Sequence, residues 1–221
     1  MNYYSEKDIQ DIVARVIANS GLCCEKAPGN AGMEVPVEIS ARHVHLDQAA
    51  VDVLFGPGYQ IREKRPLSQP GQYLAEERIK LVTAKGEMSN VAILGPLRKA
   101  VQVELSLSDA RALGIKAPVN QSGDLSGAGD VILIGPKGVV MAKGSVIVAK
   151  AHIHMTPADA EKYKVVDGEK VSVRMNTERP VTIDDVVVRV SKDFALAMHI
   201  DFDEANAALV GNPATGILKK G

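Results

Sequence analysis

Residues 43–47 read His-Val-His-Leu-Asp, and residues 152–156 read His-Ile-His-Met-Thr. Two further segments, residues 104–108 (Glu-Leu-Ser-Leu-Ser) and 199–203 (His-Ile-Asp-Phe-Asp), show the same alternation of polar and apolar residues. Each segment reaches an Asp, Ser or Thr and then enters an Ala-containing stretch, which predicts a strand end, an N-cap and a short helix. The first positions are 61, 48 and 47 residues apart. We therefore infer an internal repeat and two related barrel-like units.

The chain around these segments consists of short runs rich in Val and Ile, which are typical of strands. Gly-Pro turns separate them, at a spacing that favours barrels or sandwiches over alternating strand–helix units. We predict a mainly β protein of two tandem β-barrel domains capped by short α-helices. The predicted strands are Val35–Ser40, Ile79–Thr83, Asn90–Leu94, Val101–Leu105, Val131–Ile134, Val139–Ala142, Ser145–Ala149, Val171–Met175 and Val186–Val190.

The N-terminal region has a different pattern. Within residues 1–20, the stretch 5–20 predicts an amphipathic helix, because five apolar residues recur at helical spacing. Residues 21–34 contain Pro and Gly and predict a linker. Residues 35–150 then form the first and central barrel segment, and residues 151–221 form the second, completed by the strand at 35–42. The helix either folds back onto the barrels or docks into a partner's groove.

Composition excludes several classes of protein. The chain has 26 Lys and Arg against 27 Asp and Glu, so it lacks the basic field that non-specific nucleic-acid binding needs. It has no Trp and only three Phe, which leaves little material for base stacking. Its two cysteines, Cys23 and Cys24, are adjacent and lie in the predicted linker, so a disulfide framework is not expected. No apolar run suits a membrane span or a signal peptide, and we expect a soluble intracellular protein.

The histidines supply the chemistry that the sequence predicts. In a strand, residues i and i+2 share a face, so each His-x-His pair presents two imidazoles to one side. A single pair is as compatible with hydrogen-bonded, half-buried histidines as with metal ligands. Two pairs, with Glu104 and His199 at the corresponding repeat positions, favour metal binding. Nitrogen-rich sites with an occasional carboxylate suit zinc, and three protein ligands leave a coordination position open.

Three other features are candidates for ligand binding. Arg98 follows a Gly-Pro turn just before Glu104, where its guanidinium suits a phosphate, although an exposed turn Arg is the alternative. Residues 122–130 form a Gly-rich loop that matches neither a P-loop nor a complete dinucleotide fingerprint. Asn206 follows His199 by seven residues and either returns to the same site or caps a helix at the surface.

Several motifs, taken in chain order, resemble the PduL-type phosphate propanoyltransferases, a family of phosphotransacylases. The motifs are Arg42-His-Val-His-Leu, Gly95-Pro-Leu-Arg, Val101-Gln-Val-Glu-Leu-Ser, Lys150-Ala-His-Ile-His-Met and His199-Ile-Asp-Phe-Asp-Glu-Ala-Asn. The resemblance extends from about Val35 to Gly211. It implies two tandem β-barrels and an active site between them with two divalent metal ions, expected to be zinc.

The resemblance also implies roles for individual residues. It assigns one metal to His43, His45 and Glu104 and the other to His152, His154 and His199, with Asn206 nearby as a further ligand or outer-shell residue. Arg98 corresponds to the phosphate-binding arginine. For coenzyme A we expect contacts from Ser122, Gly123 and Lys143.

The implied reaction is the reversible conversion of acyl-CoA and phosphate into acyl phosphate and CoA. Because no Cys or Ser stands beside a matched base in the sequence, we expect direct transfer in a ternary complex. A binuclear metallohydrolase and a metal-stabilised structural protein are the alternatives. Propanoyl and acetyl groups both remain open, as do the native metal and the oligomeric state, with a homo-oligomer among the options.

The family resemblance also predicts a location. An N-terminal amphipathic extension often directs such enzymes into a bacterial microcompartment, and residues 5–20 resemble that peptide. We therefore expect a bacterial cytoplasmic enzyme inside a microcompartment, with propanediol degradation as an associated pathway. Shell or cargo proteins are the expected partners, and neither nucleic acid nor a membrane is expected.

Overall fold

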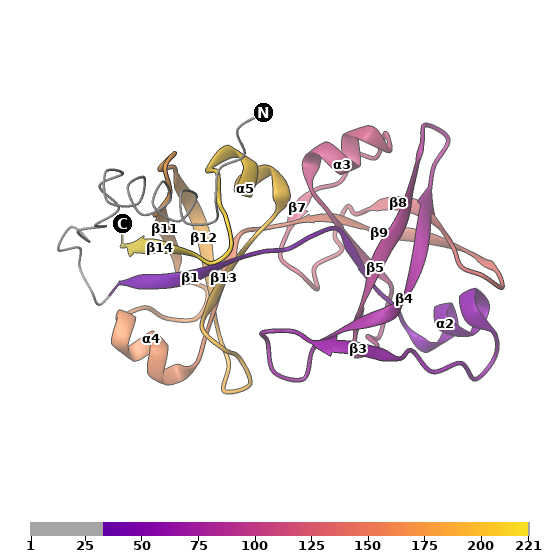
Figure 1. The fold of residues 1–221 in the computed structure, drawn as a ribbon, viewed down its shortest axis with the longest axis horizontal. Helices are drawn as coiled ribbons and strands as arrows, with labels where there is room; N and C mark the ends of the chain where they lie inside the picture. The colour runs from indigo at the N-terminus through magenta and orange to yellow at the C-terminus, as the bar shows by residue number, and fades with distance from the viewer. Residues whose placement is uncertain (1–32, 221) are drawn as a thin grey trace, which may run out of the picture. The chain divides into compact units, whose positions relative to one another are not determined.

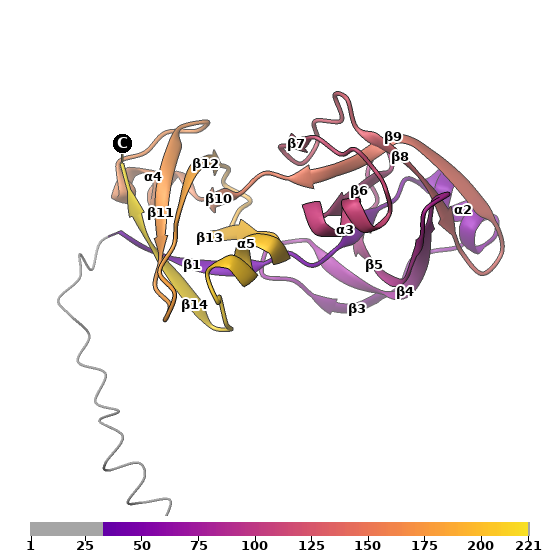
Figure 2. The same ribbon diagram turned by 90° about the horizontal axis from the view of Figure 1, so that it is seen from above.

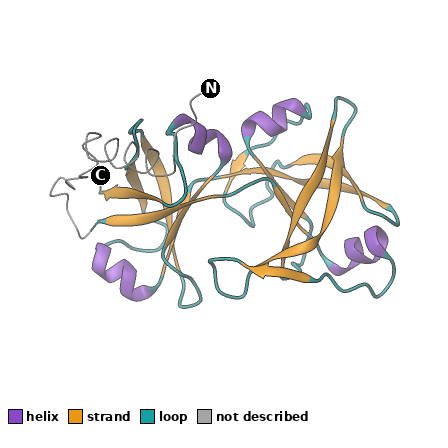
Figure 3. Ribbon diagram, viewed as in Figure 1, coloured by secondary structure: helices purple, strands orange, loops and turns teal. Residues whose placement is uncertain are grey.

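A computed structural model describes residues 33–220, and these residues are built mainly from strands (Figures 1 and 3). The predicted helix at 5–20 and most of the predicted linker lie outside this range. The strands are β1 (Glu34–Ile39), β2 (His43–His45), β3 (Glu63–Pro66), β4 (Tyr73–Val82), β5 (Glu87–Gly95), β6 (Gln102–Leu105), β7 (Val119–Asn120), β8 (Gly129–Ile134), β9 (Val139–Ala149), β10 (His152–Met155), β11 (Lys170–Met175), β12 (Thr182–Val190), β13 (Ala197–Ile200) and β14 (Ala214–Lys219). The helices are α2 (Gln48–Phe55), α3 (Leu107–Ala112), α4 (Pro157–Tyr163) and α5 (Phe202–Ala207).

The C-terminal barrel is a closed ring in the order β1-β13-β10-β12-β11-β14. β1 comes early in the chain but pairs with β13 in parallel and with β14 antiparallel, which closes the ring. Alternate residues of these strands fill the interior: Val35 and Val37 of β1 pack with Ile153 and Met155 of β10. The intervening side chains therefore face out of the barrel.

The N-terminal barrel follows the order β4-β5-β2-β6-β9, and β8 closes it by pairing with both β9 and β4. β3 and β7 extend the sheet at β4 and β9. Val44, Val103 and Leu105 belong to its buried apolar core. The prediction of a mainly β fold with two barrels and short helices is confirmed.

Two of the predicted strands, Val139–Ala142 and Ser145–Ala149, are parts of one strand, β9, so the predicted break between them was wrong. Gly144 lies at that point with a φ of 55°, and its N–H donates to the Asp130 carboxylate at 2.7 Å. Because glycine lacks a Cβ, it adopts this left-handed conformation at little cost, and the strand continues through it.

Each repeat segment ends a strand and begins a helix, as predicted. In the first and third segments the N-caps are Asp47 and Thr156, at the fifth position. In the second and fourth segments the N-caps are Ser106 and Asp201, at the third position, so these helices begin two residues earlier than predicted. Ser108 and Asp203 lie in the first turns instead.

The two barrels repeat the same strand pairing. β2 pairs antiparallel with β6 and parallel with β5, and β10 pairs antiparallel with β13 and parallel with β12. Both barrels belong to one compact unit. Helices α3 and α5 lie side by side between the barrels (Figure 2). There the Ser108 N–H of α3 donates to the Asp203 carboxylate of α5 at 2.8 Å. A second junction is the Gln69 side chain, which exchanges two hydrogen bonds with the backbone of Ala195.

None of the helices described within residues 33–220 has the length and apolar character needed to cross a bilayer.

Candidate active site and metal centre

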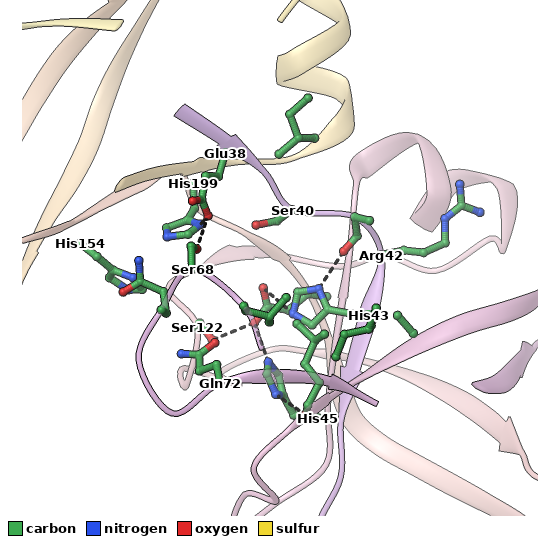
Figure 4. A pocket seen from close by; sticks show the side chains of 18 of the residues that line it. Glu38, Ser40, Arg42, His43, His45, Ser68, Gln72, Ser122, His154 and His199 are labelled. Carbon is green, nitrogen blue, oxygen red and sulfur yellow. Dashed lines mark hydrogen bonds and ion pairs between the residues drawn. The ribbon is translucent and has the colours of Figure 1, made fainter. Parts of the chain in front are cut away.

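The first candidate ligand group stands on the outer face of the N-terminal barrel. β2 and β6 place His43 directly opposite Glu104, while Val44 between the two histidines points into the core. Nε2 of His43 lies 3.5 Å from a carboxylate oxygen of Glu104, and Nε2 of His45 lies 3.9 Å from the other. The ligand atoms of the three residues all lie within 4.8 Å of one another. Figure 4 shows His43 and His45 in the pocket, with Ser122 near them.

The ring orientations in this group are fixed by backbone carbonyls. Nδ1 of His43 lies 2.8 Å from the carbonyl oxygen of Ala41, and Nδ1 of His45 lies 3.2 Å from that of Leu94. A carbonyl oxygen only accepts, so each Nδ1 donates its hydrogen. The Nε2 of a neutral ring then offers its lone pair toward Glu104, as a metal ligand requires.

The second candidate group is formed in the same way by the C-terminal barrel. β10 and β13 place His152 directly opposite His199, and His154 follows His152 on the same face. Nδ1 of His152 lies 2.8 Å from the Lys150 carbonyl, matching the contact of His43. The three ligand atoms again lie within 4.8 Å of one another. The Phe194 ring stacks on His154 with a centroid separation of 4.0 Å.

Several ring nitrogens of the second group are buried without a partner in the described part of the chain. They are both nitrogens of His154 and Nε2 of His199. Buried polar atoms are nearly always hydrogen-bonded, so such a cluster calls for an explanation. A metal ion bound by these nitrogens would satisfy them, and three imidazoles are a donor set that zinc accepts.

Burial sets the protonation of the imidazoles. It lowers the pKa of His45 and of His199 to about 3 in each case, with neighbouring imidazoles adding to the effect. The pKa of His154 is lowered for the same reasons. These rings are therefore neutral at pH 7 and carry the lone pairs that ligation needs.

The pKa of His43 is raised and not lowered, because Glu104 lies beside it. Burial lowers the pKa of His43, but the charge and hydrogen bond of Glu104 outweigh it, and the pKa lies above the ordinary value. Burial likewise raises the pKa of Glu104, yet His43, His45 and the Ser122 hydroxyl hold that pKa far below its usual range. Glu104 is therefore a carboxylate at any physiological pH.

A hydrogen-bond network connects Glu104 to predicted substrate-binding residues. The Ser122 hydroxyl donates to Glu104 at 2.8 Å and accepts from an Arg98 Nη at 3.1 Å. Gln102 also donates to Glu104 at 2.5 Å, and its side-chain oxygen accepts from the Gly123 N–H at 2.9 Å. The structure thus brings three of the predicted residues together beside the first ligand group.

Both ligand groups line one cavity of about 650 Å3. Five arginines line it against two carboxylates, those of Glu38 and Glu104, so the cavity is cationic. The arginines are Arg42, Arg65, Arg78, Arg98 and Arg189. A cavity of this size and charge suits an anionic ligand such as a phosphate or a phosphorylated cofactor.

Three predicted residues, Gly123, Lys143 and Asn206, do not line this cavity. Lys143 is exposed on β9, and Asn206 is exposed on α5; neither lines the cavity. Several contributors were not predicted from the sequence, among them Gln102, Arg189 and Glu38. Gln102 carried a signal, because it precedes Glu104 by two residues on the same strand face. Arg189 carried none, since it reaches His154 only through the pairing of β10 with β12.

Comparisons with known proteins identify the family of this chain. A family model described as phosphate propanoyltransferase matches residues 36–211. A phosphate propanoyltransferase of Listeria monocytogenes is 58% identical over 173 residues, 78% of this chain and 81% of the relative. One from Alkaliphilus metalliredigens is 46% identical over 215 residues, 97% of this chain and 99% of the relative. One from Clostridioides difficile is 51% identical over 78% of this chain and 83% of the relative. The chain therefore belongs to the phosphate propanoyltransferase family of phosphotransacylases.

Proposed function

We propose that this enzyme transfers a propanoyl or acetyl group between coenzyme A and inorganic phosphate, with two divalent metal ions, expected to be zinc. One observation carries the proposal: two three-ligand groups and the Arg98 network converge on one cationic cavity. The family membership supports the same reaction.

In the forward direction, a phosphate oxygen attacks the carbonyl carbon of the thioester. A carbon–oxygen bond forms, the carbon–sulfur bond breaks, and the sulfur leaves with its electron pair as the CoA thiolate. Arg98 binds the phosphate and orients it for attack, because a guanidinium pairs with two phosphate oxygens at once. The Ser122 hydroxyl lies beside Arg98 and accepts a hydrogen bond from it, while the Gly123 N–H donates to Gln102.

The ligand assignment is part of the proposal. His43, His45 and Glu104 would hold one metal ion, and His152, His154 and His199 the other. When bound, such ions polarise a thioester carbonyl and stabilise a departing thiolate. Glu104 adds negative charge to the first group, while Gln102 and Ser122 both donate to one of its oxygens, Oε1.

Direct transfer, without an acyl-enzyme, is the expected route. The Ser122 hydroxyl lies beside a carboxylate of the first ligand group, since it donates to Glu104 at 2.8 Å. The depressed pKa of Glu104 makes it a poor proton acceptor, so it does not activate that hydroxyl as a nucleophile. Initial-rate kinetics should give intersecting rather than parallel double-reciprocal lines, and a trapped acyl-protein would contradict this route.

The remaining proposals concern coenzyme A and location. Lys143 is proposed to contact CoA, so Lys143→Ala should raise the KM for acyl-CoA. Asn206 is proposed as a further ligand or outer-shell residue of the second metal, so Asn206→Ala should weaken zinc binding there. Residues 5–20 are proposed to direct the enzyme into a bacterial microcompartment through shell or cargo proteins. A reporter fused to residues 1–20 should form foci in a compartment-forming cell, and diffuse fluorescence would count against this role.

The central test is release of CoA thiol from propanoyl-CoA and acetyl-CoA by the purified protein, with and without phosphate and chelator. We expect phosphate-dependent, chelator-sensitive release that His152→Ala and Arg98→Ala both abolish or severely reduce. Arg174 is an exposed arginine of β11, so Arg174→Ala is the matched control and should behave as wild type. Release without phosphate would favour a hydrolase, and tight metal binding without release would favour a structural role.

A further inference from the structure

Glu38 stands directly beside the second ligand group without belonging to it. β1 and β13 run parallel, and their register pairs Glu38 with His199. Val37 on β1 and Met198 on β13 point into the barrel core, so Glu38 and His199 share the outer face. A carboxylate oxygen of Glu38 lies 3.8 Å from Nδ1 of His199, and the Ser68 hydroxyl donates to that same oxygen at 2.5 Å (Figure 4).

His199 differs in this respect from three of the other histidines. Nδ1 of His43, His45 and His152 each faces a backbone carbonyl oxygen. Nδ1 of His199 faces a charged side chain instead. The partner is thus supplied by a neighbouring strand of the barrel and not by the backbone.

The N-terminal barrel has no counterpart to this carboxylate. There β6 pairs in parallel with β9, as β13 does with β1, and the register places Ile147 beside Glu104. Ile147 is fully buried. The first group has its carboxylate within the ligand set, whereas the second group consists of three imidazoles and has its carboxylate on the adjacent strand.

The position of Glu38 affects the charge around the second ligand group. Three neutral imidazoles do not offset any of the charge of a divalent cation, and Arg189 lies beside His154 across the β10–β12 pair. A nearby arginine disfavours a cation at the second group. The charge of Glu104 acts on His152 and His199 from the first group, and Glu38 is the carboxylate on the strand adjacent to His199. Because a carboxylate only accepts, it also favours the tautomer of His199 with hydrogen on Nδ1 and a free lone pair on Nε2.

We propose that Glu38 is a positioning residue for the second ligand group: it orients His199 in the ligating tautomer and raises the affinity of the group for a divalent cation. This inference rests on the proposed function, since it takes the second group to be a metal site. At 3.8 Å the contact is an electrostatic one and not a hydrogen bond. Ser68 supports it by holding the carboxylate from the N-terminal barrel.

The first test measures zinc binding to the metal-free protein by competition with a chromophoric chelator. We expect wild type to bind two zinc ions, and Glu38→Gln to weaken one of them by about 10- to 100-fold while leaving the other unchanged. Glu34→Gln is the matched control, because Glu34 lies on the same strand, is exposed and accepts a hydrogen bond from Thr215. It should retain both wild-type affinities.

The outcomes separate the two proposals. Two sites in wild type with unchanged affinities in Glu38→Gln would overturn the role of Glu38 but leave the metal sites intact. Absence of zinc binding to wild type would overturn the metal part of the proposed function. Thermal unfolding of the metal-free variants shows whether any loss of affinity comes from misfolding, and we expect Tm values equal to wild type.

A second test does not depend on metal. Nitrogen-15 NMR of the metal-free protein, with His199→Gln used for assignment, reports which ring nitrogen of His199 carries the hydrogen. We expect the hydrogen on Nδ1 in wild type and a loss of that preference in Glu38→Gln. A wild-type His199 with its hydrogen on Nε2 would overturn the proposal.

Discussion

The two ligand groups have the same backbone arrangement but differ in charge, because one contains a carboxylate and the other does not. In both, a two-stranded antiparallel pair sets two residues opposite each other, His43 with Glu104 and His152 with His199. The first group contains a carboxylate held by Gln102 and Ser122. The second is entirely imidazole, and several of its nitrogens have no partner among the described residues.

The comparison shows that the repeat supplies geometry while single residues supply charge. The strand, N-cap and helix recur four times, and each presents a side chain at the same strand position. Placing Glu at one copy and His at another changes the charge of the group without moving its backbone. The first group, beside Arg98, is suited to a site where phosphate and cation meet.

Substitution of a ligand residue in either group should have the largest effect on activity. Glu104→Ala and His154→Ala each remove one of three proposed ligands. Loss of an outer-shell partner alone costs about 10- to 100-fold in metal affinity or activity, so loss of a ligand should lower kcat/KM by more than about 100-fold. Each variant should retain about one zinc per chain. Activity assays and metal analysis check both expectations. Wild-type activity in either variant would mean that only one group takes part.

Arg98→Ala should affect the first ligand group and not the second, because Arg98 lies on the first group's side of the cavity. Hydrogen bonds to a charged group contribute about 1.5–3 kcal/mol, so loss of the proposed phosphate contact should raise the KM for phosphate by about 10- to 100-fold. The zinc affinity of the second group should not change. Phosphate-dependent initial rates measure the effect, with Arg174→Ala as control. An unchanged KM for phosphate would remove Arg98 from the phosphate site.

The helices that follow the two groups should differ in pH dependence. Burial raises the pKa of Glu204 in α5 from 4.5 to about 7. Between these values the folded state binds a proton that the unfolded state has released, so the free energy of unfolding falls as pH rises. The slope is at most about 1.4 kcal/mol per pH unit. Glu204→Gln should remove this slope, as urea unfolding at pH 5 and pH 7 can measure.

The matched variant is Asp109→Asn, because Asp109 occupies the same helix position in α3. Burial also raises the pKa of Asp109, but Arg42 opposes the shift with an ion pair at 3.1 Å. Its contribution to the slope should therefore be smaller than that of Glu204. Equal slopes in wild type and Glu204→Gln would contradict the assignment of the proton to Glu204.

The smallest expected effect concerns Phe194, which stacks on His154 and has no equivalent on the first group. Phe194→Leu should lower the free energy of unfolding by about 0.5–1.5 kcal/mol through loss of the ring contact. It should weaken zinc binding to the second group only. Phe202→Leu, at an exposed ring on α5, should have no such effect on zinc affinity.

The local part of this site was accessible from sequence. The i, i+2 spacing placed each histidine pair on one strand face, and the repeat placed Glu104 and His199 in frame with them. Helix starts in α3 and α5 were wrong by two residues, because the third residue of those segments, Ser106 or Asp201, already provides the N-cap. The break within β9 was wrong because Gly144 absorbs a left-handed conformation inside a strand.

The missing part depends on long-range strand pairing. Glu38 reaches His199 only because β1 joins the C-terminal barrel, and Arg189 reaches His154 only through β12. No local pattern encodes such registers. Lys143 and Asn206 show the reverse case: both lie in chain segments adjacent to the site but on exposed surfaces away from the cavity.

The most direct test of the central claim, that both barrels together form one metal-dependent transacylase site, is a titration of zinc into metal-free enzyme with activity as the readout. Phosphate-dependent release of CoA from propanoyl-CoA should be absent at the start and rise until two equivalents of zinc per chain are bound. Full activity in the metal-free protein, or saturation at one equivalent, would contradict it.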